Sequence, residues 1–233
     1  MRTVDDEGYS QAGTYETSIA TAARGTLRYT LSLPSGFSPD AGPYPLVIAL
    51  HYGFDRTVPF PPYYGRGVLD GLVGPSLSDL SPIIAAPDSH GETWTETTLV
   101  AAVLELFDAL AERYPVDRQR TLLTGFSLGG LGTWSITGSS GNRFRAAIAV
   151  AAAPSDDTAT AYPNIPLYVI HSEADEIFPI AKVDRAVEIS LARGVEVTYK
   201  KLNGVTHFNV PGFAAALSET VPWLQEQWEK QPA

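Results

Sequence analysis

Five continuous apolar segments between residues 46 and 171 constrain the fold more than any other feature of this sequence. They are LVIAL (46–50), IIAAP (83–87), TLLTG (121–125), AAIAVAAA (146–153) and LYVIH (167–171). A strand with one face in water alternates apolar and polar residues, whereas a strand covered on both faces needs no alternation. The segments therefore predict a mostly parallel sheet with helices packed on both of its faces.

Helical segments are predicted between and after these strands. Thr97–Tyr114 repeats apolar residues at helical spacing, and Ile180–Arg193 is followed by Gly194, a common residue at helix C-termini. A last strand is expected at Glu196–Leu202 and a closing helix at Pro211–Trp228. Alternation of strands and helices is typical of a doubly wound α/β sheet.

The N-terminal part has a different pattern. Residues 1–13 are predicted to form a polar, flexible leader, and residues 14–233 a single domain, because no repeat or linker interrupts them. From Tyr15 to Leu33 the sequence alternates and is rich in β-branched residues, with a break at 23–25, which predicts an antiparallel β-hairpin. The expected fold is α/β, with a doubly wound, mostly parallel sheet, this hairpin and no large cap.

Composition and charge exclude several classes of protein. The chain has 233 residues, 44% of them hydrophobic, and a formal net charge of −10 at pH 7, which repels nucleic-acid phosphates. No apolar run is long enough to span a membrane, and the absence of cysteine excludes disulfides and thiolate metal sites. The first residues, MRTVDDEGYSQ, do not match a secretory signal, so a cytoplasmic location is expected. An exported protein whose signal had been removed would show the same features.

The pentapeptide GFSLG (125–129) matches the pattern G-x-S-x-G, and it stands between a predicted strand and a predicted helix. Glycine two residues before and after Ser127 lets the strand and the helix approach closely around a strained turn. The hydroxyl then projects above the sheet, and the N–H of Leu128 at the new helix start can bind an oxyanion. The alternative is a serine that only caps the helix.

A serine hydroxyl is a weak nucleophile until a base takes its proton. Chain order in this arrangement predicts an acid and then a histidine after the serine. Asp175 follows the strand LYVIH and His207 follows the last predicted strand, so both are expected at the same edge of the sheet as Ser127. Asp175 would orient the imidazole, with Glu173 and Glu176 on the same loop as the alternatives.

The other three histidines lead to different predictions. His51 ends a buried strand and is expected to brace the following loop through hydrogen bonds to the backbone. His171 is expected to be structural, and His90 lies near the same edge without an assigned role. No cluster of histidine and carboxylate residues has ligand spacing, so no metal is expected.

The loop after the first parallel strand is the place for a second oxyanion donor. Its sequence is His51-Tyr52-Gly53, where the usual order is His-Gly, so the N–H of either Tyr52 or Gly53 is predicted to take this role.

Substrate contacts are predicted on the loops at the same edge. The candidates are Phe54 and Tyr63, from a loop rich in aromatic residues and proline, and Trp94 after the next strand. A loop packed on the surface and a core tryptophan are the alternatives. Only about a dozen residues separate AAIAVAAA from LYVIH, too few for a helical cap, so a shallow and open pocket is expected.

Two motifs give the chain a family resemblance. Residues 113–120 (RYPVDRQR) and 125–134 (GFSLGGLGTW) resemble the R-Y-x-x-D-x-x-R and G-x-S-x-G-G-x-G-T-W motifs of one branch of the α/β-hydrolase superfamily. That branch contains carboxylesterase-like and phospholipase-like proteins and predicted peptidases. The resemblance runs from about Leu46 to His207 and implies a cofactor-free serine hydrolase with Ser127, Asp175 and His207 as catalytic triad.

The expected function is hydrolysis of carboxylic esters, with short acyl groups or bulky alcohols, on small molecules or on a polymer. A serine peptidase of the same fold and a non-catalytic binding module are the two alternatives. An intact serine, acid and histidine in the correct order argue against the binding module, because a protein that only binds gains nothing from a strained turn.

Overall fold

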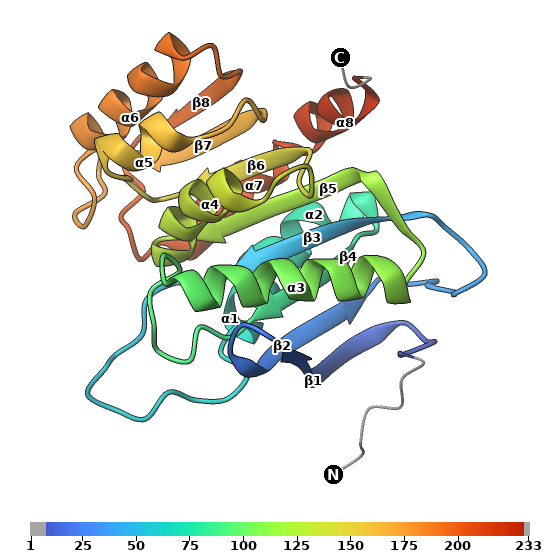
Figure 1. The fold of residues 1–233 in the computed structure, drawn as a ribbon. Coiled ribbons are helices and arrows are strands. Elements are labelled where there is room, and N and C mark those ends of the chain that lie inside the picture. The colour runs from blue at the N-terminus through green and yellow to red at the C-terminus, as the bar shows by residue number, and fades with distance from the viewer. Residues whose placement is uncertain (1–7, 231–233) are drawn as a thin grey trace.

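The computed structural model of the protein describes residues 8–230, and its framework is one eight-stranded sheet (Figure 1). The strands are β1 (Gly13–Thr21), β2 (Gly25–Leu33), β3 (Tyr44–Leu50), β4 (Ile83–Pro87), β5 (Val116–Phe126), β6 (Ala146–Val150), β7 (Leu167–Ser172) and β8 (Val197–Leu202). Their order across the sheet is β1-β2-β4-β3-β5-β6-β7-β8.

The strand directions confirm the α/β fold predicted from the sequence. β1 and β2 form an antiparallel hairpin in which Thr21 lies opposite Gly25, and β2 is also antiparallel to β4. All other neighbours, from β4 and β3 through β8, are parallel.

Helices cover both faces of the sheet (Figure 1). They are α1 (Arg66–Val68), α2 (Gly74–Leu77), α3 (Thr97–Arg113), α4 (Leu128–Ser139), α5 (Asp156–Ala161), α6 (Ile180–Ala192), α7 (Val210–Ser218) and α8 (Val221–Glu229). A π-helical segment joins α1 to α2, and a 3-10 turn follows α2. Helices α3 to α6 pack on one face, and α1, α2, α7 and α8 pack on the other.

Strand β3 shows why the apolar runs need no alternation. Val47 and Ala49 pack toward α1, α2 and α7, whereas Leu46 and Ile48 pack toward α3, and all four side chains are fully buried. Successive side chains of a strand point to opposite faces, so a strand with helices on both sides buries every residue. Burying each large aliphatic side chain of this kind contributes about 1.5–3 kcal/mol.

The end of the predicted leader packs on the domain. The ring of Tyr9 stacks on that of Tyr15 with centroids 3.8 Å apart, and its backbone N–H donates to the hydroxyl of Tyr114. Strand β1 already begins at Gly13. The predicted flexible leader thus has its last residues, from Tyr9 onward, in the packed structure, while residues 1–7 lie outside the described part of the chain.

The prediction of one closing helix at 211–228 is wrong, because two helices occupy this segment. α7 ends at Ser218, and α8 begins at Val221 after a turn in which the hydroxyl of Thr220 donates to the carbonyl of Leu217. Pro222 lies in the first turn of α8. Proline has no N–H and its ring collides with the carbonyl four residues earlier, so a helix continued through Pro222 would be kinked or broken there.

The strand order brings the functional loops together. From β3 the chain crosses to β4 on one side and then returns to β5 on the other. At such a reversal the loops after the two central strands diverge and leave a crevice at the carboxyl edge of the sheet. The loop after β3 extends from this edge at the lower left of Figure 1, and Ser127 follows β5 at the same edge.

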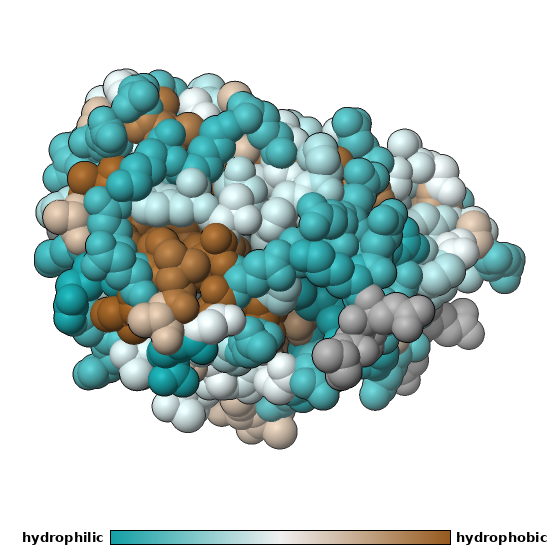
Figure 2. Space-filling model, turned by 90° about the horizontal axis from the view of Figure 1, so that it is seen from above, coloured by the Kyte–Doolittle hydropathy of each residue, from teal (hydrophilic) through white to brown (hydrophobic). Residues whose placement is uncertain are grey.

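The face shown in Figure 2 is mostly hydrophilic, in keeping with the formal charge of −10, and its largest group of apolar side chains forms one patch. Within residues 8–230, no helix combines the length and the apolar composition that crossing a membrane requires.

Candidate active site

Ser127 stands in a strained turn between β5 and α4. Its backbone has φ of 58° and ψ of −118°, a region that residues with a side chain rarely adopt. A methyl group added at Gly125 would overlap the carbonyl of Gly129, and one added at Gly129 would overlap the carbonyl of Leu50. The two glycines of the pentapeptide therefore permit the close contact of strand and helix that holds the turn.

A chain of hydrogen bonds connects the three residues predicted as catalytic. Nε2 of His207 lies 2.9 Å from Oγ of Ser127, and Nδ1 lies 2.8 Å from Oδ2 of Asp175. A carboxylate only accepts hydrogen bonds, so Nδ1 carries the proton and Nε2 accepts from the serine hydroxyl. This tautomer is the one that can remove a proton from Ser127.

Asp175 is fixed by its own loop. Its Oδ1 accepts hydrogen bonds from the backbone N–H groups of Ile177 (2.9 Å) and Phe178 (2.7 Å), which leaves Oδ2 for the imidazole of His207. Glu176, one of the two alternatives from the sequence, instead accepts from the backbone N–H of His207 at 2.8 Å. It therefore joins the two loops without reaching the ring.

Three phenylalanine rings surround the imidazole of His207, which is only 3% exposed. Phe126 packs against it with centroids 5.3 Å apart, Phe178 at 5.6 Å, and Phe208 meets it edge-on at 5.4 Å. Phe126 is buried, whereas Phe208 is the most solvent-exposed of the three. An apolar surrounding of this kind excludes water and strengthens the hydrogen bonds of the imidazole.

His51 braces the loop after β3, as expected from the sequence. Its Nε2 accepts from the backbone N–H of Ser89 at 3.0 Å, so Nδ1 carries the proton and donates to the carbonyl of Tyr52 at 2.7 Å. Burial lowers the pKa of His51 to about 4, although the bond to Tyr52 and the charge of Asp88 oppose this shift. The residue is therefore a neutral connector between two loops.

His171 is buried directly below the Asp175 loop. Its Nε2 donates to the carbonyl of Phe178 at 2.8 Å and lies 4.0 Å from Oδ2 of Asp175. Burial lowers the pKa of its imidazole. The ring supports the loop from within the core, in agreement with the structural role expected for it.

His90 lies on the loop after β4, with a positive φ of 56° and its ring stacked near that of Phe60. Burial also lowers the pKa of His90. Across residues 8–230, no three or more histidine, aspartate or glutamate side chains are grouped as a metal would need.

The two candidate oxyanion loops lie beside each other. Leu128 is the first residue of α4, and a methyl group built on Gly53 would lie 3.4 Å from its side chain. The first N–H groups of a helix have no partner within the helix, so the Leu128 N–H is available to a ligand. The N–H of Gly53 shares a peptide group with the carbonyl of Tyr52, which accepts from His51. The N–H of Tyr52 shares one with the carbonyl of His51, which accepts from the indole of Trp94, so both peptide groups have fixed orientations.

Trp94 is buried in the structure, as the core alternative expects, but it also lines a small cavity next to Leu128, and the substrate contact predicted for it stays a prediction. Its side chain is 2% exposed, its indole N–H donates to the carbonyl of His51 at 2.9 Å, and it packs closely against Gly132. Because the indole N–H has a hydrogen-bond acceptor inside the protein, the ring can be buried without leaving a polar group unpaired, and burial of its apolar surface is favourable.

Phe54 and Tyr63 are both half-buried in the loop after β3. Phe54 packs edge-to-face with Phe60 and Tyr64, and it borders a cavity of about 20 Å³ next to Leu128. Such a volume holds about one water molecule. Tyr63 does not line this cavity, so the two residues predicted to contact substrate do not share one pocket.

Asp88 is a buried residue at this edge that the sequence analysis missed. Its carboxylate is fully inaccessible and accepts from the backbone N–H groups of Tyr63 (2.7 Å) and Gly65 (3.1 Å), and from the guanidinium of Arg28. It thereby fixes the turn at Tyr63, where φ is 58°. An acidic residue directly after the apolar run IIAAP was the available signal.

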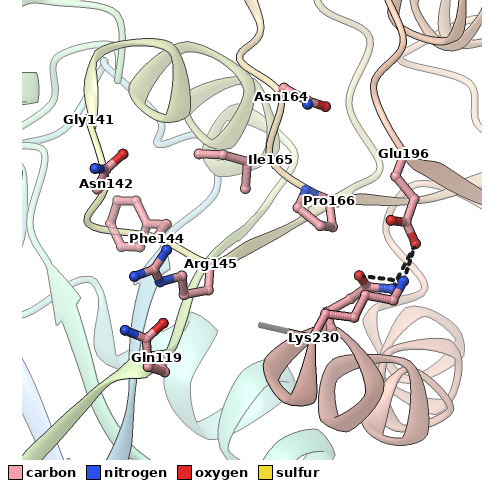
Figure 3. A pocket seen from close by; sticks show the side chains of 11 residues that line it. Gln119, Gly141, Asn142, Phe144, Arg145, Asn164, Ile165, Pro166, Glu196 and Lys230 are labelled. Carbon is pink, nitrogen blue, oxygen red and sulfur yellow. Dashed lines mark hydrogen bonds and ion pairs between the residues drawn. The ribbon is translucent and has the colours of Figure 1, made fainter. Parts of the chain in front are cut away.

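A much larger cavity, of about 500 Å³, lies at the opposite edge of the sheet (Figure 3). It is lined by residues that precede β6, β7 and β8 and by the end of α8, among them Asn142, Arg145, Asn164, Glu196 and Lys230. In Figure 3 Lys230 is paired with Glu196. None of the residues predicted to be functional borders this cavity.

The fold and this geometry define the class of the protein. A serine on a strained turn after the central strand, followed in the chain by an acid and a histidine on loops of the same edge, is the arrangement of the α/β-hydrolases. The chain belongs to the Esterase family, whose sequence model, described as "Putative esterase", matches residues 21–232. It is accordingly a serine hydrolase of the esterase class. No curated protein sequence matches the chain.

Solved structures with the same fold include several esterases. A thermostable esterase is 23% identical with a TM-score of 0.73, covering 91% of this chain, which spans 62% of that protein. The S954A mutant of the feruloyl esterase module from Clostridium thermocellum, complexed with sinapinate, is 12% identical with a TM-score of 0.74, over 96% of this chain and 91% of that one. The S-formylglutathione hydrolase of Staphylococcus aureus is 12% identical with a TM-score of 0.70, over 92% and 99%.

Proposed function

We propose that the protein hydrolyses carboxylic esters by a two-step acyl-enzyme mechanism, with Ser127 as nucleophile, His207 as general base and acid, and Asp175 as the residue that orients His207. The observation that carries the proposal is the unbroken hydrogen-bond chain from Ser127 through His207 to Asp175, with 2.9 and 2.8 Å steps. Both distances lie in the range that proton transfer requires.

The first step forms the acyl-enzyme. Nε2 of His207 takes the proton of the Ser127 hydroxyl while Oγ attacks the ester carbonyl carbon, and the carbonyl oxygen becomes an oxyanion. The N–H of Leu128, with that of Tyr52 or Gly53, binds this oxyanion. One such donor is typically worth about 3 kcal/mol in the transition state. Asp175 stabilises the imidazolium that now exists at His207.

The leaving group and then water complete the cycle. Nε2 of the charged His207 gives its proton to the alcohol oxygen as the bond between this oxygen and the acyl carbon breaks. After the alcohol has left, His207 takes a proton from water, and the resulting hydroxide attacks the acyl carbon. The proton then returns to Oγ of Ser127 as the acid is released, so the enzyme is regenerated without a cofactor.

The substrate we propose is an ester with a short acyl group, either a small molecule or a group attached to a polymer, and the site of action is the cytoplasm. The small cavity beside Leu128, about 20 Å³, supports a short acyl group, because a long chain has no room there. The short α5, with six residues, adds no cap over the edge.

The test is a series of p-nitrophenyl esters from acetate to decanoate, with an aryl amide as control, assayed on wild-type protein and Ser127→Ala. We expect turnover that is fastest for the shortest acyl groups and a loss of at least about 1,000-fold in Ser127→Ala. A fluorophosphonate probe is expected to add its mass to the peptide that contains Ser127. Undiminished hydrolysis by the alanine variant would refute the nucleophile, and equal turnover of the amide would favour a peptidase.

A further inference from the structure

Phe208 exposes more of its side chain than any other large hydrophobic residue in the described part of the chain. Its relative exposure is 74%, against 49% for Ile177, 51% for Val58 and 52% for Leu191. Isolated apolar residues at a surface are common. The position of Phe208 sets it apart, because it directly follows His207.

The ring of Phe208 stands at the outside of the imidazole. It meets the ring of His207 at an angle of 84°, with the centroids 5.4 Å apart, while Phe126 closes the buried side. His207 is itself nearly inaccessible, and its Nε2 faces Ser127. Most of the Phe208 ring is therefore free to contact whatever approaches the histidine from solvent.

The mechanism decides which part of an ester approaches from that side. Nε2 of His207 must come within about 2.6–3.2 Å of the leaving alcohol oxygen to protonate it. The carbonyl oxygen instead binds the N–H of Leu128, which belongs to the start of α4. The alcohol part of the ester consequently lies toward the His207 loop.

A second exposed apolar residue stands on the neighbouring loop. Ile177 follows Asp175 by two residues and donates its backbone N–H to that carboxylate, so its place relative to the site is fixed. The loops that carry Asp175 and His207 are also joined by the bond from the His207 N–H to Glu176. Each of the two loops therefore presents one exposed apolar side chain.

We propose that Phe208 is a specificity-determining residue that binds the apolar alcohol group of the ester, so that the preferred substrates are esters of aromatic or arylalkyl alcohols. This proposal rests on the proposed function and deepens it. Covering about half of an exposed phenyl ring with an apolar group is expected to change kcat/KM by about 10-fold.

The experiment keeps the acyl group constant and varies the alcohol. Ethyl acetate and 2-phenylethyl acetate are compared in wild-type protein, Phe208→Ala, Phe208→Leu and the matched control Leu191→Ala, which removes an exposed apolar side chain from α6. We expect Phe208→Ala to lower the ratio of kcat/KM for phenylethyl over ethyl ester about 10-fold, chiefly through KM. Phe208→Leu is expected to retain part of the ratio, and Leu191→Ala all of it.

Other outcomes overturn the proposal. An equal loss on both esters in Phe208→Ala would mean that the ring only shields His207. A change in the preference among ethyl esters of different acids, with the alcohol ratio unchanged, would place the ring at the acyl group. A wild-type protein without activity on any ester would overturn the proposed function itself, whereas an active enzyme with an unchanged ratio in Phe208→Ala would overturn this inference alone.

Discussion

His51 makes the stability of this protein depend on pH in a way that can be calculated. It is buried between the loops after β3 and β4, and burial lowers its pKa from 6.5 to about 4. It holds both loops in its neutral form, since Nε2 accepts from Ser89 and Nδ1 donates to Tyr52. Protonation would remove the acceptor at Nε2 and place a charge among buried groups, which is costly.

The sign and size of this pH dependence follow from the linkage between proton binding and folding. Below pH 6.5 the unfolded chain binds a proton at His51 that the folded protein does not bind until about pH 4, so acidification favours unfolding. The contribution of His51 to the free energy of unfolding is therefore full above pH 6.5 and is lost progressively as the pH falls to about 4. A shift of this size amounts to about 3 kcal/mol in total, of which about 2 kcal/mol is lost by pH 5.

The assay is urea unfolding at pH 7.5 and pH 5.0 for wild-type protein and His51→Gln. Glutamine can present both an acceptor and a donor but does not titrate, and the other histidines contribute equally to both proteins. We expect the free energy of unfolding to fall by about 2 kcal/mol more in the wild type than in the variant when the pH is lowered from 7.5 to 5.0. If both proteins lost the same free energy of unfolding, His51 would not be the neutral, buried group that its hydrogen bonds require.

Two further substitutions test the site and the turn that holds it. Asp175→Asn is expected to lower kcat in ester assays about 1,000- to 10,000-fold, because the amide can donate to Nδ1 of His207 and favour the wrong tautomer. The control Glu176→Gln retains an acceptor for the His207 N–H and is expected to lose far less activity in the same assays. Gly129→Ala is expected to cost about 3 kcal/mol or to prevent folding, because its methyl group overlaps the carbonyl of Leu50, whereas Gly138→Ala in the same helix meets nothing closer than 3.5 Å and is expected to gain up to about 1 kcal/mol. Equal unfolding midpoints for the two alanine variants in urea would refute the steric argument.

The sequence contained enough to find the strand positions and the central residues of the site. Apolar runs without alternation marked β3 through β7, because burial on both faces leaves a continuous apolar run in the sequence itself. Ser127 was found because glycines and a strand-to-helix change surround it. Asp175 and His207 followed from chain order, because parallel strands place the loops at their carboxyl ends along one edge.

Other features depended on contacts that no local pattern contains. The bond from Asp88 to the Tyr63 turn joins residues 25 positions apart, and the choice of Asp175 over Glu176 depends on which carboxylate reaches the ring. Trp94 lies in the core because it packs against Gly132. The residues next to it in the sequence are mostly polar and did not indicate that it is buried.

The amino-acid sequence by itself thus determined the sheet, the strained serine and the order of the three residues around it, since these follow from local hydrophobic periodicity and backbone conformation. Only the tertiary structure decided the 2.8 and 2.9 Å contacts among Ser127, His207 and Asp175, and the exposure of Phe208 beside them. The physical reason is that periodicity reports how each segment is buried, whereas hydrogen bonds between distant loops depend on the relative positions of whole elements.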